Sequence, residues 1–140
     1  MHKRAWITGP DVSLSLHSDE KGVGPEALNG IIDTGASIIC FDNRIAMRLG
    51  LTASNRKPVQ MADGRQFMSP VYAVRMTVPV LEFDDVVQVC GVQMEFPSTR
   101  VLIGRSFLKD YIINYNGPKE LFEFHETDRG NEYFHVDHDE

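Results

Sequence analysis

Short segments with a β-type pattern, separated by turn residues, run through most of the sequence and limit the chain to a mainly β fold. Val12, Leu14 and Leu16 alternate with polar residues, which is the period-2 pattern of a strand with one buried face. Similar runs predict strands at 28–32, 38–41, 58–62, 66–79, 86–92, 102–103, 111–115 and 120–124. A strand-like run at 71–80 overlaps the one at 66–79. Together with short helices at 44–49 and 105–110, these strands predict a barrel or a sandwich.

Turn residues indicate where the strands reverse direction. Asp63-Gly64 lies between two strand-like runs and predicts a hairpin, because glycine adopts a positive φ without steric cost. Asn116-Gly117 predicts a second hairpin near the C-terminal end. Asp84-Asp85, which stands between apolar residues, predicts a turn and not an acid/base pair. The polar, Gly-rich segment 18–25 predicts a loop. Its GVG at 22–24 lacks the Lys-Ser/Thr pair and the following helix of a phosphate-binding loop.

The length of 140 residues, with 42% hydrophobic and 24% charged residues, fits one domain with one core. We expect an N-terminal segment 1–10, a folded domain 11–125 and an acidic, flexible tail 126–140. The net charge of −6 is concentrated in 125–140, where acidic residues outnumber the single Arg129. The remaining chain is about neutral, so no basic surface for nucleic acid is predicted.

Targeting signals are not evident in the sequence. No apolar run reaches the roughly 20 residues of a membrane span, and the basic start lacks the apolar region of a signal peptide. These observations predict a cytoplasmic protein without a membrane partner, unless the chain is a fragment of an anchored parent. Cys40 and Cys90 lie in apolar, strand-like runs, which favours buried free thiols over a disulfide.

The most informative motif is IIDTGAS at 31–37. Two apolar β-branched residues bring Asp33 to the end of a strand, and Thr34-Gly35 then turn the chain. A carboxylate at such a turn is held on a rigid element and points into open space, as a catalytic acid or base requires. The spacing leaves one alternative open, which is an aspartate that only caps its own β-turn.

IIDTGAS resembles the catalytic loop of the aspartic proteases, and a short chain with one such loop is similar to the single-domain, retroviral-type retropepsins. VLIGRSFLKD at 101–110 resembles a second element of that family, in which two apolar residues and a glycine lead into a short helix. Asp63-Gly64 lies where the family places its flap. The resemblance covers residues 11–125 and points to the bacterial or DNA-damage-inducible branch.

This resemblance implies a closed, retropepsin-like barrel with two short helices that is active as a symmetric homodimer. It implies that Asp33 of both subunits activates a water molecule to hydrolyse an extended peptide or protein, without a metal or another cofactor. The loop residues that would shape the site are Thr34, Gly35, Ala36 and Ser37. The residues that would support it from the second element are Leu102, Ile103, Gly104 and Arg105. The hairpin residues that would form the flap are Ala62, Asp63, Gly64, Phe67 and Met68.

The chain departs from the family pattern at two points. The supposed flap has a single glycine instead of a Gly-rich tip, and Ser37 stands where retroviral enzymes often carry an acid. Two other interpretations therefore stay open. The chain could be a catalytically silent module that keeps the fold for dimerisation or peptide binding, or a monomeric barrel in which Asp33 caps a turn.

Two further residue groups invite a chemical interpretation. His125, His135 and His138 near Asp137 and Asp139 resemble a metal-binding tract, but an unstructured tail is the preferred interpretation. Cys40 has no basic neighbour to lower its pKa, so it is interpreted as an inert core residue and not as a nucleophile.

Overall fold

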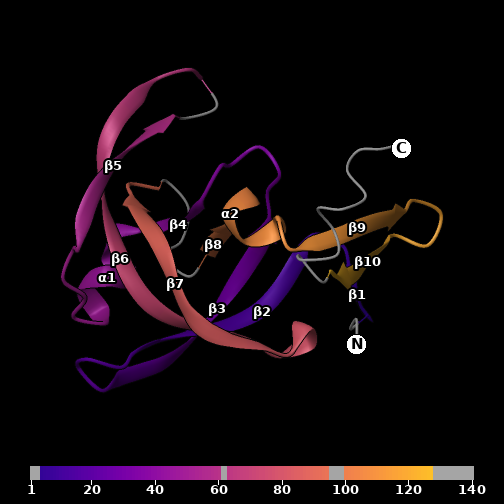
Figure 1. The fold of residues 1–140 in the computed structure, drawn as a ribbon, viewed down its shortest axis with the longest axis horizontal. Helices are drawn as coiled ribbons and strands as arrows, with labels where there is room; N and C mark the ends of the chain where they lie inside the picture. Colours follow the sequence, from indigo (N-terminus) through magenta and orange to yellow (C-terminus); the bar gives the residue numbers. More distant parts are fainter. Residues whose placement is uncertain (1–3, 61–62, 95–99, 128–140) are drawn as a thin grey trace.

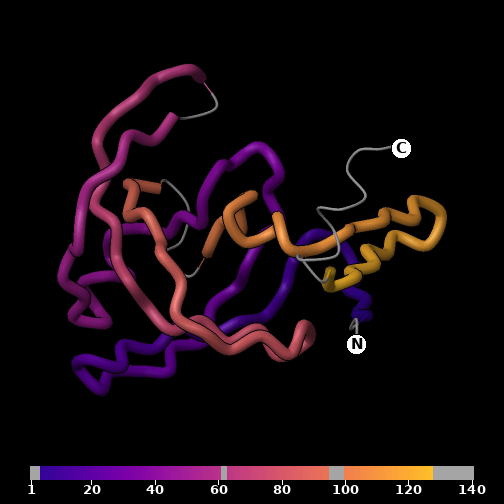
Figure 2. The backbone as a smooth tube through the Cα atoms, viewed as in Figure 1, coloured from indigo at the N-terminus to yellow at the C-terminus, as the bar shows by residue number. Residues whose placement is uncertain are grey.

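A six-stranded closed barrel, a hairpin that extends from it and a small second sheet make up the computed structural model, which describes residues 4–60, 63–94 and 100–127 (Figures 1 and 2). The strands are β1 (Arg4–Thr8), β2 (Asp11–Ser18), β3 (Val23–Ile32), β4 (Ile39–Asp42), β5 (Asn55–Gln60), β6 (Gln66–Val78), β7 (Phe83–Val92), β8 (Arg100–Ile103), β9 (Tyr111–Asn116) and β10 (Leu121–Glu126). The helices are α1 (Asn43–Arg48), α2 (Arg105–Leu108) and the 3-10 turn η1 (Pro79–Leu81). The predicted mainly β barrel is thereby confirmed.

The barrel runs in the order β2-β3-β8-β4-β7-β6 and closes where β6 pairs with β2. The β3–β8 and β4–β7 pairs are parallel, and the other pairs of the barrel are antiparallel. Closure satisfies the backbone groups that a sheet edge would leave exposed. β5 pairs only with β6 in the described chain, so these two strands form the hairpin that Figure 1 shows extending away from the barrel.

Two apolar clusters lie on opposite faces of β4, because successive side chains of a strand point in opposite directions. Ile39 and Phe41 belong to the main core inside the barrel. Cys40 points the other way and belongs to a second cluster with Val59, Val71, Cys90 and Val92. The second cluster therefore lies between the barrel wall and the base of the hairpin.

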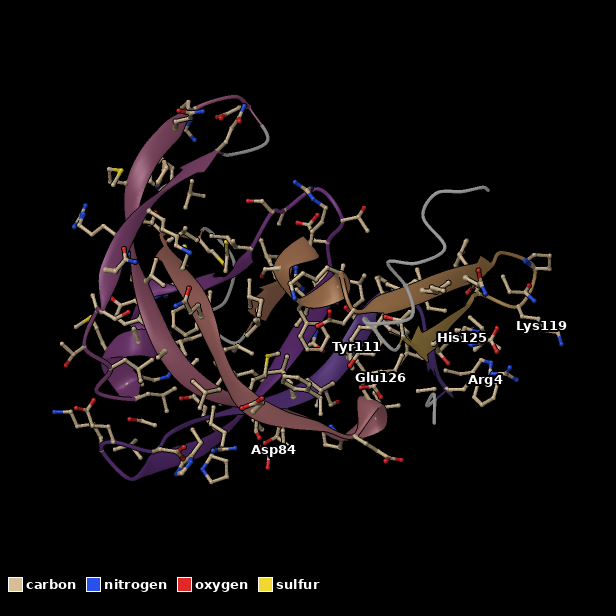
Figure 3. The ribbon with its side chains drawn as sticks, viewed as in Figure 1. Arg4, Asp84, Tyr111, Lys119, His125 and Glu126 are labelled. Atoms are coloured by element: carbon tan, nitrogen blue, oxygen red, sulfur yellow. The ribbon has the colours of Figure 1, made fainter. Side chains whose placement is uncertain are left out.

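The small sheet has the order β1-β10-β9 and packs against one side of the barrel through Ile7 and Phe124, which belong to the main core. A chain of aromatic contacts continues from the barrel into this sheet, with ring centroids 4.9, 5.4 and 5.7 Å apart along Phe83, Phe107, Tyr111 and Phe124. In Figure 3, Tyr111 and Glu126 lie at the junction with the barrel, and Lys119 lies toward the far end of the β9–β10 hairpin. Burial, helped by the negative charges of Glu126 and Asp110, raises the pKa of Tyr111 to about 12.

Both short helices form where the sequence predicts them, but α1 ends one residue and α2 two residues before the predicted end. α1 begins after Asp42, whose carboxylate accepts the Arg44 backbone N–H at 2.8 Å and so caps the helix. The chain leaves it through Gly50, which has a φ of +66°. Among the described residues, no helix is long and apolar enough to pass through a bilayer.

Two local predictions were wrong, and one strand was not predicted. The predicted loop 18–25 is shorter, because β2 and β3 already pair at Ser18 and Val23. Asp84, expected in a turn with Asp85, lies inside β7, where it accepts hydrogen bonds from Arg75 and Thr77 of the neighbouring strand. These cross-strand bonds compensate for the low strand propensity of aspartate. The strand β1 was not predicted, since its five residues contain too few alternations to reveal it.

Candidate active site

Parallel pairing of β3 with β8 brings the two sequence motifs together. Ile31 and Ile32 lie beside Leu102 and Ile103, so both strands end at the same level of the barrel. The Asp33 backbone N–H then donates to the carbonyl oxygen of Ile103 at 3.0 Å. The motifs at 31–37 and 101–110, about 70 residues apart in the sequence, therefore form one continuous structure.

Asp33 begins a tight turn that its own side chain stabilises. Its Oδ1 accepts the backbone N–H of Gly35 at 2.9 Å, and its carbonyl oxygen accepts the N–H of Ala36 at 3.2 Å. A Cβ at position 35 would lie 3.2 Å from that Oδ1, so glycine leaves room for the carboxylate. The turn-capping role is thus present, and Asp33 is at the same time half-buried in the lining of a groove.

Residues at the start of α2 hold the loop from below. The backbone N–H groups of Arg105 and Ser106 donate to the carbonyl oxygens of Ala36 and Ser37 at 2.9 and 3.0 Å. Nη1 of Arg105 donates to the carbonyl oxygen of Thr34 at 2.7 Å. These bonds fix the loop on both sides of its turn, while Thr34 and Ser37 remain exposed.

Gly104 lies against the loop so closely that no side chain fits there. A Cβ at this position would lie 2.1 Å from the carbonyl oxygen of Ile38 and 2.8 Å from that of Ala36. Both neighbours are backbone atoms and cannot move aside as a flexible side chain could. Ile103 beside it is buried in the main core, whereas Leu102 points to the other face and lines the groove.

The groove in front of Asp33 has a volume of about 420 Å³. Its floor comes from the loop, its walls from β4, β7 and β8, and one side from the end of β5. The lining residues are Asp33, Gly35, Ala36, Ser37, Ile38, Cys40, Val59, Gln60, Val92, Leu102 and Arg105. The groove thus combines one carboxylate, one guanidinium and an apolar wall.

The hairpin of β5 and β6 contributes to the groove with one of its two faces. Val59 lines the groove and pairs with Phe67, so Phe67 lies on the same face of the hairpin. Met68 pairs with Pro58 and points to the opposite face, so of these two expected flap residues Phe67 lies on the groove side of the hairpin and Met68 does not.

The turn of this hairpin carries Asp63 and Gly64, with a φ of +89° at the glycine. The carboxylate of Asp63 accepts the backbone N–H of Arg65 at 3.0 Å and its Nε–H at 2.6 Å. The backbone hydrogen bond, followed by the side-chain bond, lowers the pKa of Asp63. Ala62, the remaining residue of the expected flap, lies outside the described residues.

Sequence reasoning missed part of the groove lining, namely Ile38, Cys40, Val59, Gln60 and Val92. The alternation of residues 38–41 was a usable signal, because Ile39 and Phe41 enter the core and Cys40 must therefore point the other way. Burial, and then the nearby Cys90 and Asp33, raise the pKa of Cys40 to about 12. The thiol therefore stays protonated near neutral pH and does not supply a nucleophile.

The histidine tract is described only in part. Nε2 of His125 lies 3.2 Å from Oε1 of Glu123, while His135 and His138 lie outside the described residues. Within residues 4–60, 63–94 and 100–127, no three His, Cys, Asp or Glu side chains gather in a way that could hold a metal ion. The expected independence from a metal or cofactor stays a prediction.

Comparisons with known proteins agree with this geometry. The family model described as "gag-polyprotein putative aspartyl protease" matches residues 23–110, which include both motifs. No protein of curated function matches the sequence significantly.

Solved structures show the same fold. The crystal structure of a retropepsin-like aspartic protease from Rickettsia conorii matches with a TM-score of 0.56 at 14% identity, over 90% of this chain and 92% of that chain. An aspartic proteinase from Irpex lacteus matches with a TM-score of 0.54 at 11% identity, over 89% of this chain and 47% of that one. The present chain thus spans about half the length of the Irpex lacteus protein.

Proposed function

We propose that this chain, which belongs to the gag-polyprotein aspartyl protease family, is an aspartic endopeptidase that acts as a symmetric homodimer through Asp33 of both subunits. One observation carries the proposal. A carboxylate at the end of β3 is held by the Gly35 N–H and lines an open groove with an apolar wall. A carboxylate that served only to cap a turn would need neither the groove nor the clamp from α2.

Peptide hydrolysis of this kind requires two carboxylates, and among the described lining residues the groove contains one. Two-fold symmetry supplies the second, because it places the same residue twice about the axis. Two facing carboxylates share one proton and titrate as a pair, as is established for aspartic protease dyads. The charged member takes a proton from water, and the protonated member polarises the scissile carbonyl group. The resulting diol intermediate then breaks down as the amide nitrogen receives a proton.

The small sheet offers a surface on which a second copy can assemble. In the described chain, β1 and β9 are its outer strands, and each has one edge without a partner strand. Trp6, Ile112 and Tyr115 on these strands are 52%, 49% and 60% exposed. Unpaired strand edges next to exposed apolar side chains favour association with another strand.

An extended peptide is the substrate that the groove fits best. The groove lies between the loop of Asp33 and the end of β5, and the apolar residues Ile38, Val59 and Val92 offer contacts for apolar side chains. A peptide in this position can pair with backbone groups as an additional strand. Phe67 lies on the same face of the hairpin as Val59 and would contact the peptide from above.

The test compares the wild type with Asp33→Asn, using Asp85→Asn as the matched control. Asp85 lies on β7 outside the groove, and its Oδ1 accepts the Val86 N–H, which an asparagine oxygen can also accept. We expect Asp33→Asn to lower cleavage of an unfolded protein by more than about a hundredfold, because the dyad loses its base. Asp85→Asn should cleave at the wild-type rate, and all three proteins should have the mass of a dimer.

Each other outcome is informative. Equal cleavage by the wild type and Asp33→Asn would remove Asp33 from the mechanism. A wild-type dimer that cleaves nothing between mildly acid and neutral pH would favour the silent module for dimerisation or peptide binding. A mass near 15.8 kDa at every concentration would contradict the homodimer.

A further inference from the structure

Arg105 is exposed at the groove and has donors that the fold does not use. Its Nη1 donates to the carbonyl oxygen of Thr34, and a guanidinium group has five N–H donors. Within the described residues, no carboxylate lies within ion-pair distance of Arg105, whereas Arg65 and Arg75 each pair with an aspartate. In the single chain, Arg105 therefore offers its positive charge and unused N–H donors to the groove.

In the proposed dimer, the charge balance of the groove would be opposite to that of the chain. Asp33 and Arg105 are the charged residues among those described in its lining, and the others are apolar or neutral. In the proposed dimer, the two Asp33 side chains share a proton and carry one negative charge, while the two Arg105 side chains carry two positive charges. The groove is then positive on balance, although the chain has a net charge of −6. Such a groove attracts ligands of negative charge.

We propose that Arg105 is a specificity-determining residue that binds a carboxylate of the substrate, so that the preferred substrates are acidic peptides. The bond to Thr34 holds the guanidinium on the same loop as Asp33, at a fixed place relative to the reacting atoms. Its planar fork matches a carboxylate in geometry and charge. The apolar wall accepts the side chains next to the cleaved bond, and Arg105 accepts an aspartate or glutamate farther along the peptide.

This inference rests on the proposed function, and its test uses peptides that differ in one property. Three peptides share an apolar centre and carry glutamate, glutamine or lysine at the flanking positions. For the wild type, we expect kcat/KM to be about tenfold higher for the glutamate peptide than for the glutamine peptide. The lysine peptide should be the poorest substrate. Added salt should reduce the preference, because it screens the charge of Arg105.

Variants assign the preference to Arg105. Arg105→Gln should abolish the difference between the glutamate and glutamine peptides, and Arg105→Lys should keep part of it, because lysine retains the charge without the fork. Arg56→Gln is the matched control, since Arg56 is an exposed arginine of β5 that does not line the groove and donates to the carbonyl oxygen of Met68. It should leave the preference unchanged.

Two results of the cleavage experiment would overturn the inference. The first is equal kcat/KM for the glutamate and glutamine peptides with the wild type. The second is an equal loss for both peptides in Arg105→Gln, which would assign Arg105 to the stability of the loop or of the dimer. If no peptide is cleaved, the proposed function fails, and the same peptides with a reduced scissile bond are tested by fluorescence anisotropy. Tighter binding of the glutamate peptide than of the glutamine peptide would still support the inference if Arg105→Gln abolished this difference and Arg105→Lys reduced it. Equal binding of the two peptides by the wild type would refute the inference.

Discussion

The loop that carries Asp33 and the hairpin that borders the same groove are held in different ways. Backbone bonds from β8 and α2 hold the loop at Asp33, Ala36 and Ser37. In the hairpin, residues 63–68 are exposed, and the hydrogen bonds they make in the described chain stay within the hairpin. The loop is therefore positioned by distant parts of the sequence, and the hairpin by its own residues. A firmly held carboxylate next to a more independent element would suit the proposed function, in which the groove has to admit a long peptide.

The largest expected effect comes from Gly104→Ala. The added Cβ would lie 2.1 Å from the carbonyl oxygen of Ile38, so either the loop or α2 must move. Overpacking against backbone that cannot yield costs about 3 kcal/mol, and we expect this loss in the free energy of unfolding. Urea unfolding followed by fluorescence of Trp6 and by circular dichroism measures it.

Gly64→Ala is the matched change in the hairpin. A Cβ there would meet no atom within 4 Å, and the remaining cost comes from the φ of +89°. A left-handed conformation at a non-glycine residue costs about 1 kcal/mol. Equal losses for the two variants would contradict the different support of loop and hairpin.

Asp42→Ala should give the next largest effect. Asp42 and Asp63 stand in the same local pattern, an aspartate two residues before an arginine whose backbone N–H and side chain both bind the carboxylate. The side chain of Asp42 is 4% exposed and also accepts the N–H of Met94, whereas that of Asp63 is 53% exposed. Loss of this buried helix cap should cost about 2 kcal/mol of unfolding free energy. Asp63→Ala should leave the unfolding midpoint unchanged.

The loss at Asp42 should depend on pH. The side-chain hydrogen bond from Arg44, with smaller contributions from the backbone N–H groups of Arg44 and Met94, lowers the pKa of Asp42 below its unfolded value. A lowered pKa means that the stabilisation is complete above the unfolded pKa of about 3.9 and disappears as the pH falls toward the folded pKa. The difference between the wild type and Asp42→Ala should thus be constant above about pH 5 and shrink below pH 4. A difference that grew in acid would show that the carboxylate is not stabilised in its charged form.

The same contrast explains what the sequence could predict. The Asp33 turn and its support around Gly104 were predictable because close backbone contacts require particular residue types there, and these residue types form recognisable motifs. Gly104 is an example, since its approach to Ile38 leaves no room for a side chain. The Asp63-Gly64 turn was predictable from turn chemistry alone. The groove wall was not, because Val59 and Val92 come from strands that only the closed barrel brings to Asp33. The orientation of Phe67 and Met68 depends on the strand register, which a pattern of neighbouring apolar residues does not define.

The smallest expected effect tests that register. Phe67 and Met68 are 40% and 52% exposed, so replacing either by alanine should change the unfolding free energy by less than about 0.5 kcal/mol. Phe67 lies on the same face of the hairpin as Val59, so its ring would contact a bound peptide. Phe67→Ala removes this apolar contact. We expect KM to rise about fivefold, or roughly 1 kcal/mol, with little change in kcat, because the contact exists before and during the reaction.

Met68→Ala is the control for this change, since Met68 points away from the groove with Pro58. It should leave KM within about twofold of the wild type. Steady-state kinetics on one peptide measures both variants. A larger rise in KM for Met68→Ala than for Phe67→Ala would mean that the face of the hairpin that carries Met68 contacts the substrate. The hairpin would then have to rotate relative to the loop of Asp33 when a peptide binds.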